Sequence, residues 1–130
     1  MNLVSGATGF IGQRLFRSLR EAGLPCVGLA RSGIAGADMR IADLADKSVL
    51  TAACTGMDRV FHCAGYAHAF SSLSGDDSAL HWRINFEGTR NLVEAAGAAG
   101  VKRFVFLSSV KAMAEPGSSC ADEDIPGNPE

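Results

Sequence analysis

The sequence has no run of basic residues, no long hydrophobic run and no paired cysteine motif, and each absence argues against a class of protein. Its formal net charge is −2, and its lysines and arginines are spread along the chain, so a nucleic-acid-binding surface is not expected. Its apolar runs are broken by glycine or charge well before the ~18 residues that a membrane-spanning helix needs. The first residues lack the basic flank and apolar stretch of a secretory signal. We therefore expect a cytoplasmic protein that contacts neither nucleic acid nor membrane.

The four cysteines lie at positions 26, 54, 63 and 120 and form no Cys-x-x-Cys pair. A disulfide framework is not expected in a cytosolic chain, and Cys26 and Cys63 are predicted to lie in strands as small apolar residues. A metal site is not expected either, because the spacing of the candidate ligands matches no zinc pattern. These candidates are His62, Cys63, His68 and His81.

The chain does contain a regular alternation of strand-like and helix-like segments. Strands are predicted at 2–5, 25–31, 39–44, 59–64 and 103–108, and helices at 11–22, 46–54 and 77–99. Continuous apolar strands that alternate with helices indicate a parallel sheet covered on both faces. We expect a Rossmann-type doubly wound α/β sheet in the order 3-2-1-4-5, with the ligand crevice between the first and fourth strands. Residues 66–76 and those from 115 onward are predicted to be loops.

The strongest motif is the segment GATGFIG at residues 6–12, which follows the first strand and opens the first helix. Gly6 allows a sharp turn out of the strand, Gly9 lets a diphosphate approach the backbone, and Gly12 lets the helix pack close to the sheet. Backbone N–H groups and the helix dipole would then face the phosphates. The strand–turn–helix context favours a dinucleotide over a glycine-rich turn without a ligand.

The end of the second strand bears on the choice between NAD and NADP. The acidic residue that commonly binds the ribose 2′-hydroxyl is replaced by Ala30, and Arg31 follows it. Because a guanidinium pairs with a 2′-phosphate, Arg31 favours NADP over NAD, although a strand-end arginine can also simply be solvated. Asp43, after the third strand, is placed to meet the adenine edge or to serve as an ordinary turn or capping acid.

Five collinear motifs resemble the extended short-chain dehydrogenase/reductase family, especially its nucleotide-sugar epimerases and dehydratases of the UDP-glucose 4-epimerase kind. They cover residues 1 to about 112 in the order and spacing of that family. The motifs are GATGFIG, Ala42–Leu44, Val60–Gly65, Asn85–Leu92 and Arg103–Val110.

The resemblance implies an NAD- or NADP-dependent enzyme acting on a nucleotide sugar. It makes Ser109 the active-site hydroxyl that hydrogen-bonds the reacting substrate oxygen, and Asn85 a helix residue of supporting role. Tyr66 faces the nicotinamide or substrate, or only anchors its loop. The cofactor-binding positions that it implies are Gly6, Gly9, Phe10, Ile11, Gly12, Asp43, Leu44, Ala64 and Gly65, to which we add Thr8 of the same loop and Arg31 after the second strand.

One departure from the family concerns its general acid–base, a tyrosine with a lysine four positions later. The lysine lowers the pKa of the tyrosine, so that the phenolate can accept a proton near neutral pH. The sequence has a single tyrosine, Tyr66, and position 70 is phenylalanine. Residues 121–130 resemble the acidic stretch that precedes that tyrosine. We therefore expect residues 1–130 to be a partial NAD(P)-binding domain, without the catalytic helix, the last strands and the substrate domain.

Such a fragment would not catalyse hydride transfer alone. It would leave apolar surface around the strand at 103–108 and the helix at 77–99, which favours a homodimer. Two alternatives to the epimerase/dehydratase interpretation stay open. One is an NADPH-dependent carbonyl reductase of the same family, which Arg31 would suit. The other is a dinucleotide-sensing regulator that kept the fold and lost catalysis.

Overall fold

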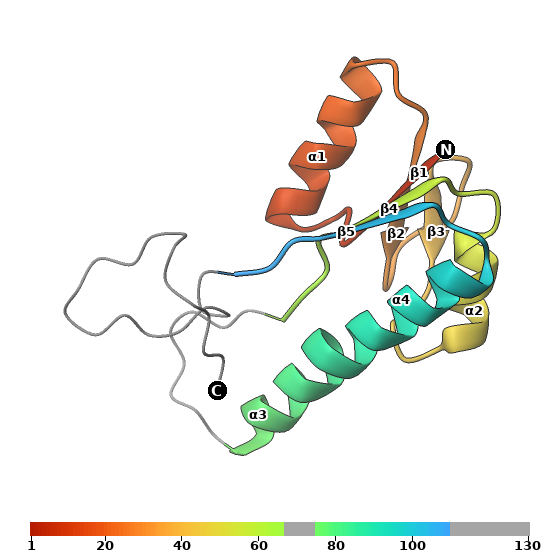
Figure 1. Ribbon diagram of the computed structural model, residues 1–130. Helices are drawn as coiled ribbons and strands as arrows, with labels where there is room; N and C mark the ends of the chain where they lie inside the picture. Colours follow the sequence, from red (N-terminus) through yellow and green to blue (C-terminus); the bar gives the residue numbers. More distant parts are fainter. Residues whose placement is uncertain (67–74, 110–130) are drawn as a thin grey trace, which may run out of the picture.

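A computed structural model describes residues 1–66 and 75–109. Figure 1 shows a parallel sheet with α1 on one face and α2 and α4 on the other. In chain order the elements are β1 (Asn2–Ser5), α1 (Phe10–Glu21), β2 (Cys26–Ala30), β3 (Met39–Ile41), α2 (Lys47–Cys54), β4 (Arg59–His62), α3 (Gly75–His81), the π-helix η1 (Trp82–Gly88), α4 (Thr89–Ala98) and β5 (Arg103–Phe106). The loops expected at 67–74 and from 115 onward lie outside the described residues.

The sheet has the predicted topology. All four strand pairs are parallel, and the order is β3-β2-β1-β4-β5, which confirms the doubly wound arrangement. Leu3 of β1 lies opposite both Val27 of β2 and Val60 of β4. The first and fourth strands are therefore neighbours, and the chain winds in opposite directions from them.

Four strands end earlier than predicted: β2 at Ala30, β3 at Ile41, β4 at His62 and β5 at Phe106. The first residue after β3 and after β4 still donates to a neighbouring backbone carbonyl, Ala42 to Ala30 and Cys63 to Ser5, and bonds to side chains begin beyond it. The N–H of Ala64 donates to the Ser5 hydroxyl, and the N–H of Ala45 donates to the Asp43 carboxylate. Cys63 consequently lies one residue past β4, which corrects its expected place within a strand, whereas Cys26 lies in β2.

The core lies between the sheet and the α2/α4 layer. Leu3, Leu50, Val60 and Leu92 are completely buried there. On the other face, α1 buries only Gly12. Leu15 and Leu19 of the predicted apolar stripe are half-buried, and Ile11 and Ala22 are exposed. The stripe is poorly covered because no second helix of the described residues packs beside α1 on that face (Figure 1).

The predicted long helix at 77–99 is present, but its middle is a π-helix. It runs as α3, η1 and α4 without a break and ends before Gly100, whose φ of 77° terminates it as expected. Gly88, the last residue of η1, packs so closely on the segment after β3 that a Cβ there would lie 2.9 Å from Leu44 Cβ. Within the described residues, no helix is long and apolar enough to cross a membrane.

Candidate functional site

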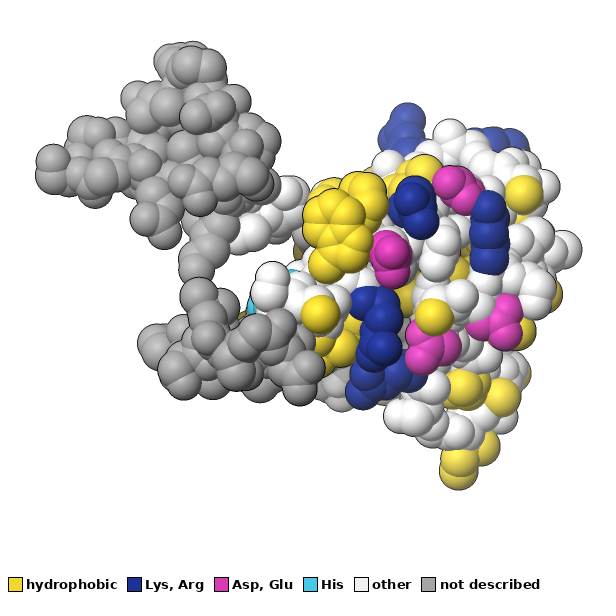
Figure 2. Space-filling view, turned by 90° about the horizontal axis from the view of Figure 1, so that it is seen from below, with side chains coloured by type: hydrophobic (Ala, Val, Ile, Leu, Met, Phe, Trp, Pro, Cys, Tyr) yellow, Lys and Arg dark blue, Asp and Glu magenta, His cyan; other side chains and the backbone are white. Residues whose placement is uncertain are grey.

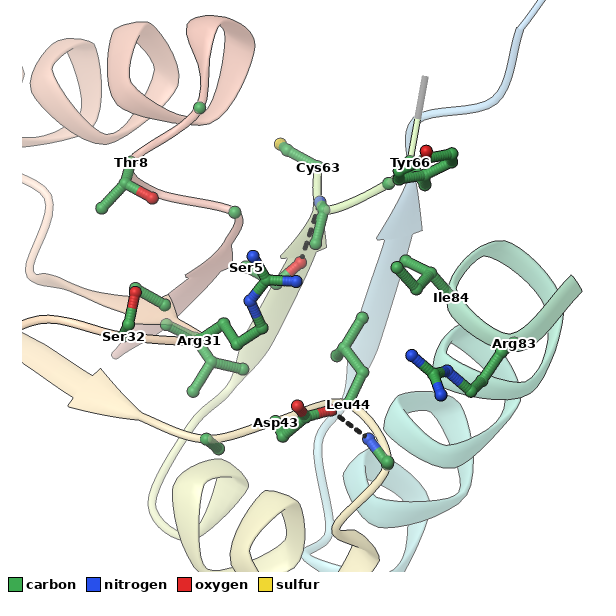
Figure 3. Close-up of a pocket in the computed structure, with 18 residues that line it drawn as sticks. Ser5, Thr8, Arg31, Ser32, Asp43, Leu44, Cys63, Tyr66, Arg83 and Ile84 are labelled. Carbon is green, nitrogen blue, oxygen red and sulfur yellow. Dashed lines mark hydrogen bonds between the residues drawn. The ribbon is translucent and has the colours of Figure 1, made fainter. Parts of the chain in front are cut away.

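A cleft of about 540 Å³ lies at the carboxyl edge of the sheet, over the point where the winding reverses. The residues that follow β1, β2, β3 and β4 line it, together with two residues of η1 (Figure 3). This is the crevice expected from the strand order. Its lining is Ser5, Gly6, Thr8, Gly9, Leu29, Ala30, Arg31, Ser32, Ala42, Asp43, Leu44, Ala45, Cys63, Ala64, Gly65, Tyr66, Arg83 and Ile84.

The glycine loop is held against the sheet at two positions that only glycine fits. Gly6 has a φ of 67°, and a Cβ on it would lie 2.7 Å from the Ala64 nitrogen. A Cβ on Gly12 would lie 2.1 Å from the Gly6 carbonyl oxygen. The Gly6 N–H donates to the Leu29 carbonyl at 3.0 Å, and the Gly9 N–H donates to the Gly6 carbonyl at 2.8 Å. The loop is therefore fixed by the chain's own backbone.

The loop leads into a helix whose N-terminus has no side-chain cap. Gly9 is the N-cap residue and forms no side-chain hydrogen bond. The N–H groups of Phe10, Ile11 and Gly12 have no acceptor within the helix, because the first turn of a helix leaves such donors unpaired. Together with the positive end of the helix dipole, these groups can bind an anion. The side chains of Phe10 and Ile11 are exposed, and residues 10–12 do not line the cleft.

One end of the cleft is formed by the segments after β2 and β3. Asp43 accepts a hydrogen bond from the Ala45 N–H at 2.9 Å. The carbonyl of Leu44 accepts one from the Asn91 side chain of α4, also at 2.9 Å. Arg31 extends into the cleft from the end of β2 (Figure 3). The predicted residues Arg31, Asp43 and Leu44 thus lie together.

The wall formed by the helix contains two residues that were not predicted from the sequence, Arg83 and Ile84 of η1. They belong to a π-helical segment whose last residue, Gly88, packs on Leu44, and a helix-period pattern does not reveal such a segment. Ser32 and Cys63 were also not predicted, although each adjoins a predicted residue.

The other end of the cleft is formed by Ala64, Gly65 and Tyr66, which follow β4. Asn85 of η1 holds this segment by two hydrogen bonds. Its Oδ1 accepts from the Tyr66 N–H at 2.7 Å, and its Nδ2 donates to the Tyr66 carbonyl at 2.9 Å. The Tyr66 ring lies edge-on to that of His81, with centroids 4.9 Å apart. Asn85 thus supports the wall of the cleft through the backbone of Tyr66.

A buried polar chain lies directly beneath the cleft. Ser5 Oγ is 2.6 Å from His62 Nδ1, and His62 Nε2 is 2.9 Å from Thr89 Oγ1. The same serine oxygen accepts the Ala64 N–H at 3.3 Å. Burial lowers the pKa of His62 to about 4, because the charged imidazolium would lose its water. A neutral imidazole therefore joins β1, β4 and α4.

Ser109 lies three residues past the end of β5, at the same edge of the sheet. It is exposed and does not line the cleft. Its role as an active-site hydroxyl stays a prediction.

The cysteines of the described residues are free thiols. Cys26 and Cys54 are buried and Cys63 is partly buried, and burial raises the pKa of each of the three thiols. Across residues 1–66 and 75–109, no group of three or more His, Cys, Asp or Glu side chains could hold a metal ion. His68 and Cys120 lie outside the described residues.

A parallel sheet in this order, a glycine loop entering α1 and a cleft over the β1–β4 boundary define a Rossmann-type α/β protein. The chain belongs to the NAD dependent epimerase/dehydratase family, whose model matches residues 2–130.

Three known proteins illustrate the similarity. UDP-glucose 4-epimerase of Vibrio cholerae is 31% identical over 117 residues, which are 87% of this chain and 36% of the relative. Cinnamoyl-CoA reductase 1 of Oryza sativa subsp. japonica is 36% identical over 124 residues, which are 85% of this chain and 34% of the relative. The crystal structure of a short-chain dehydrogenase/reductase superfamily protein from Agrobacterium tumefaciens with bound NAD matches at 33% identity and a TM-score of 0.83, covering all of this chain and 39% of that one. The chain thus spans about a third of the length of these curated relatives.

Proposed function

We propose that this chain is the cofactor-binding part of an NAD(P)-dependent nucleotide-sugar epimerase or dehydratase. The observation that carries the proposal is the uncapped N-terminus of α1, which follows the rigid loop of Gly6 and Gly9 at the mouth of the cleft. The free N–H groups of Phe10, Ile11 and Gly12 would bind the diphosphate. Asp43 and Leu44 would contact the adenine, and Ala64 and Gly65 the nicotinamide half.

A nicotinamide held beside Ala64 and Gly65 would supply reversible hydride transfer with a sugar carbon. The residues of this chain would bind and orient the dinucleotide, and Ser109 would hydrogen-bond the reacting oxygen of the sugar. The nucleotide-sugar substrate is supported by the similarity to a protein named UDP-glucose 4-epimerase.

Proton transfer calls for a group that these 130 residues do not supply. Tyr66 is the single tyrosine, and Phe70 stands where the family's lysine would follow it. We expect residues 1–130, as a partial NAD(P)-binding domain, to bind the dinucleotide without turning over a sugar. In the whole protein a tyrosine–lysine pair would take the proton.

Arg31 supports NADP as the cofactor, because a guanidinium in the cleft can pair with a 2′-phosphate. The same residue favours a second candidate, an NADPH-dependent carbonyl reductase, to which the similarity to cinnamoyl-CoA reductase 1 adds support.

The exposed face of the long helix supports a homodimer. Trp82 is 60% exposed, Phe86 is 47% exposed, and their ring centroids lie 4.4 Å apart. Figure 2 views the molecule from below and shows a prominent hydrophobic group beside basic and acidic side chains. Apolar surface with a polar rim is typical of an interface.

Calorimetric titration of the 130-residue chain with NAD⁺ and NADP⁺ tests the cofactor proposal. A Gly9→Ala substitution adds a methyl group where the diphosphate would approach, without requiring a positive φ, since Gly9 has a φ of −82°. We expect it to weaken both dinucleotides by about tenfold. Gly97→Ala is the matched control, because a Cβ there meets nothing within 4 Å. No binding by the unaltered chain at millimolar dinucleotide, or equal affinity in the two variants, would contradict the proposal.

A further inference from the structure

Two arginines meet the cleft from opposite walls, and neither has an anionic partner in the described part of the chain. Arg31 follows β2, and Arg83 belongs to η1. In Figure 3, Arg31 reaches toward the middle of the cleft and Arg83 extends toward Leu44 from the facing helix. Other basic groups, such as Arg20 and Lys47, form ion pairs with carboxylates.

Arg83 reaches this wall from the π-helix η1. Arg83 and Ile84 line the cleft, and the next residue, Asn85, bonds to the backbone of Tyr66. Two consecutive helix residues therefore line the cleft, and the third holds the segment that forms one end of it. Because Gly88 packs directly on Leu44, the turn that carries Arg83 lies close to the segment after β3. Single π-helical turns of this kind are frequent at functional sites.

The charges that line the cleft do not balance. Among its described lining residues, Arg31 and Arg83 give two positive charges and Asp43 gives one negative charge, which leaves a net +1. The carboxylate of Asp43 already accepts the Ala45 N–H. A diphosphate would lie at the other side of the cleft, on the amides of α1, so the surplus positive charge sits at the adenosine end.

A bound dinucleotide would cover both guanidinium groups and remove part of their water. Desolvation of a cation is costly unless an anion meets it. NAD carries only a hydroxyl at the adenosine 2′ position, whereas NADP carries a phosphate of nearly two negative charges. The charge imbalance is thus matched by NADP and not by NAD.

Resting on the proposed dinucleotide function, we propose that Arg83 is a specificity-determining residue. It acts with Arg31 as the second source of positive charge for the 2′-phosphate, so that arginines on two separate walls select NADP over NAD. The strand-end arginine alone does not set the preference.

The test is calorimetric titration of the 130-residue chain with NADP⁺ and NAD⁺, for the unaltered protein and for Arg83→Ala, Arg83→Lys and Arg31→Ala. We expect Arg83→Ala to weaken NADP⁺ about tenfold and to change NAD⁺ by less than about twofold. Arg83→Lys keeps the charge and should retain most of the preference. Arg17→Ala, an exposed arginine of α1 outside the cleft, removes one positive charge elsewhere and should change neither affinity.

Each other result overturns the proposal in a distinguishable way. If the unaltered chain binds NADP⁺ and Arg83→Ala leaves the ratio of the two affinities unchanged, Arg83 is not a specificity residue and the cofactor proposal stands. Equal weakening of both dinucleotides would mean that Arg83 contacts a part that they share, which also rejects the proposal. Tighter binding of NAD⁺ by the unaltered chain would reject it as well. If neither dinucleotide binds, the proposed function fails, and this inference fails with it.

Discussion

At the scale of single residues, a buried histidine connects the cleft to the core. His62 has no exposed surface. Besides its contacts with Ser5 and Thr89, its ring stacks on Phe106 and meets Phe104 edge-on, with centroids 5.5 and 5.9 Å away. A charged imidazolium has no water in such a place, so the folded state requires the neutral form.

This requirement predicts a loss of stability in mild acid. The pKa of His62 is lowered from its ordinary 6.5 to about 4 in the folded state. Between these values the unfolded chain binds more protons than the folded one. The contribution of His62 to the free energy of unfolding is therefore fully present above pH 6.5 and is lost as the pH falls toward 4. The slope is about 1.4 kcal/mol per pH unit, with a total of about 3 kcal/mol. Urea denaturation followed at several pH values measures it.

The control variants are His62→Gln, which should flatten this slope, and His81→Gln, which should keep it. The pKa of Asp58 is lowered to about 2 by hydrogen bonds from the N-terminal ammonium and Lys102. Its contribution is lost only as the pH falls below the ordinary 3.8, outside the histidine window. The pKa of Glu94 is lowered from its ordinary 4.5 by a hydrogen bond from Lys47, so its contribution is lost only below that value. A slope that survives between pH 6.5 and 4.5 in His62→Gln would contradict the assignment.

The sequence predicted those lining residues of the cleft whose positions follow directly from the ends of the strands. Gly6, Gly9 and Asp43 follow strands closely, so the strand order alone brings them to one edge. Arg83 and Ile84 could not be predicted in this way, because their place depends on how tightly a helix packs on a neighbouring loop. The pairing of the Ser5 and His62 side chains follows from parallel register, which sets these two strand-end residues opposite each other.

At the scale of the secondary-structure elements, two glycines near the end of α4 have opposite roles. Gly97 lies within the helix and is exposed, and a Cβ added to it would meet nothing within 4 Å. Gly100 has a φ of 77° and terminates the helix. A side chain is therefore tolerated at the first position and strained at the second.

We expect Gly97→Ala to raise the free energy of unfolding by about 0.5–1 kcal/mol, because alanine loses less backbone entropy in a helix. Gly100→Ala should lower it by about 1 kcal/mol, because an L-residue is strained at positive φ. Thermal or urea denaturation of the two variants measures both changes in the free energy of unfolding. A destabilised Gly97→Ala protein would show that α4 is not helical at that position.

The existence and order of the elements were predictable, whereas their ends and the π-turn were not. Apolar runs and helical spacing mark each element. Strand ends depend on partners that the pattern does not name, as where Ala64 bonds to the Ser5 hydroxyl. The spacing of Leu80, Ile84 and Leu92 fits a helix without distinguishing an α-turn from a π-turn.

At the scale of the whole molecule, the apolar surface of the long helix predicts self-association. Trp82 and Phe86 form an exposed ring pair, and Arg90 covers Phe86 with its guanidinium 5.6 Å from the ring centre. Tryptophan and arginine are among the residues on which protein interfaces most often depend.

Sedimentation velocity over a range of concentrations tests this expectation. The 130-residue chain should sediment as a dimer at high concentration, and Trp82→Ala should weaken the dimer by about tenfold or more. Ile34→Ala is the control, because Ile34 is also apolar and is more exposed but lies between β2 and β3. A stable monomer at high concentration would contradict the dimer. Equal effects of the two substitutions would show that the dimer interface does not lie on this helix.

We propose that the amides at the start of α1 bind the diphosphate of the cofactor. The most direct measurement is a ¹⁵N–¹H NMR titration of the 130-residue chain with NADP⁺, following each backbone amide. The largest shifts should fall on Gly9, Phe10, Ile11 and Gly12, with none on Gly97. Saturating shifts confined to another part of the chain, or no shift at residues 9–12, would contradict the account.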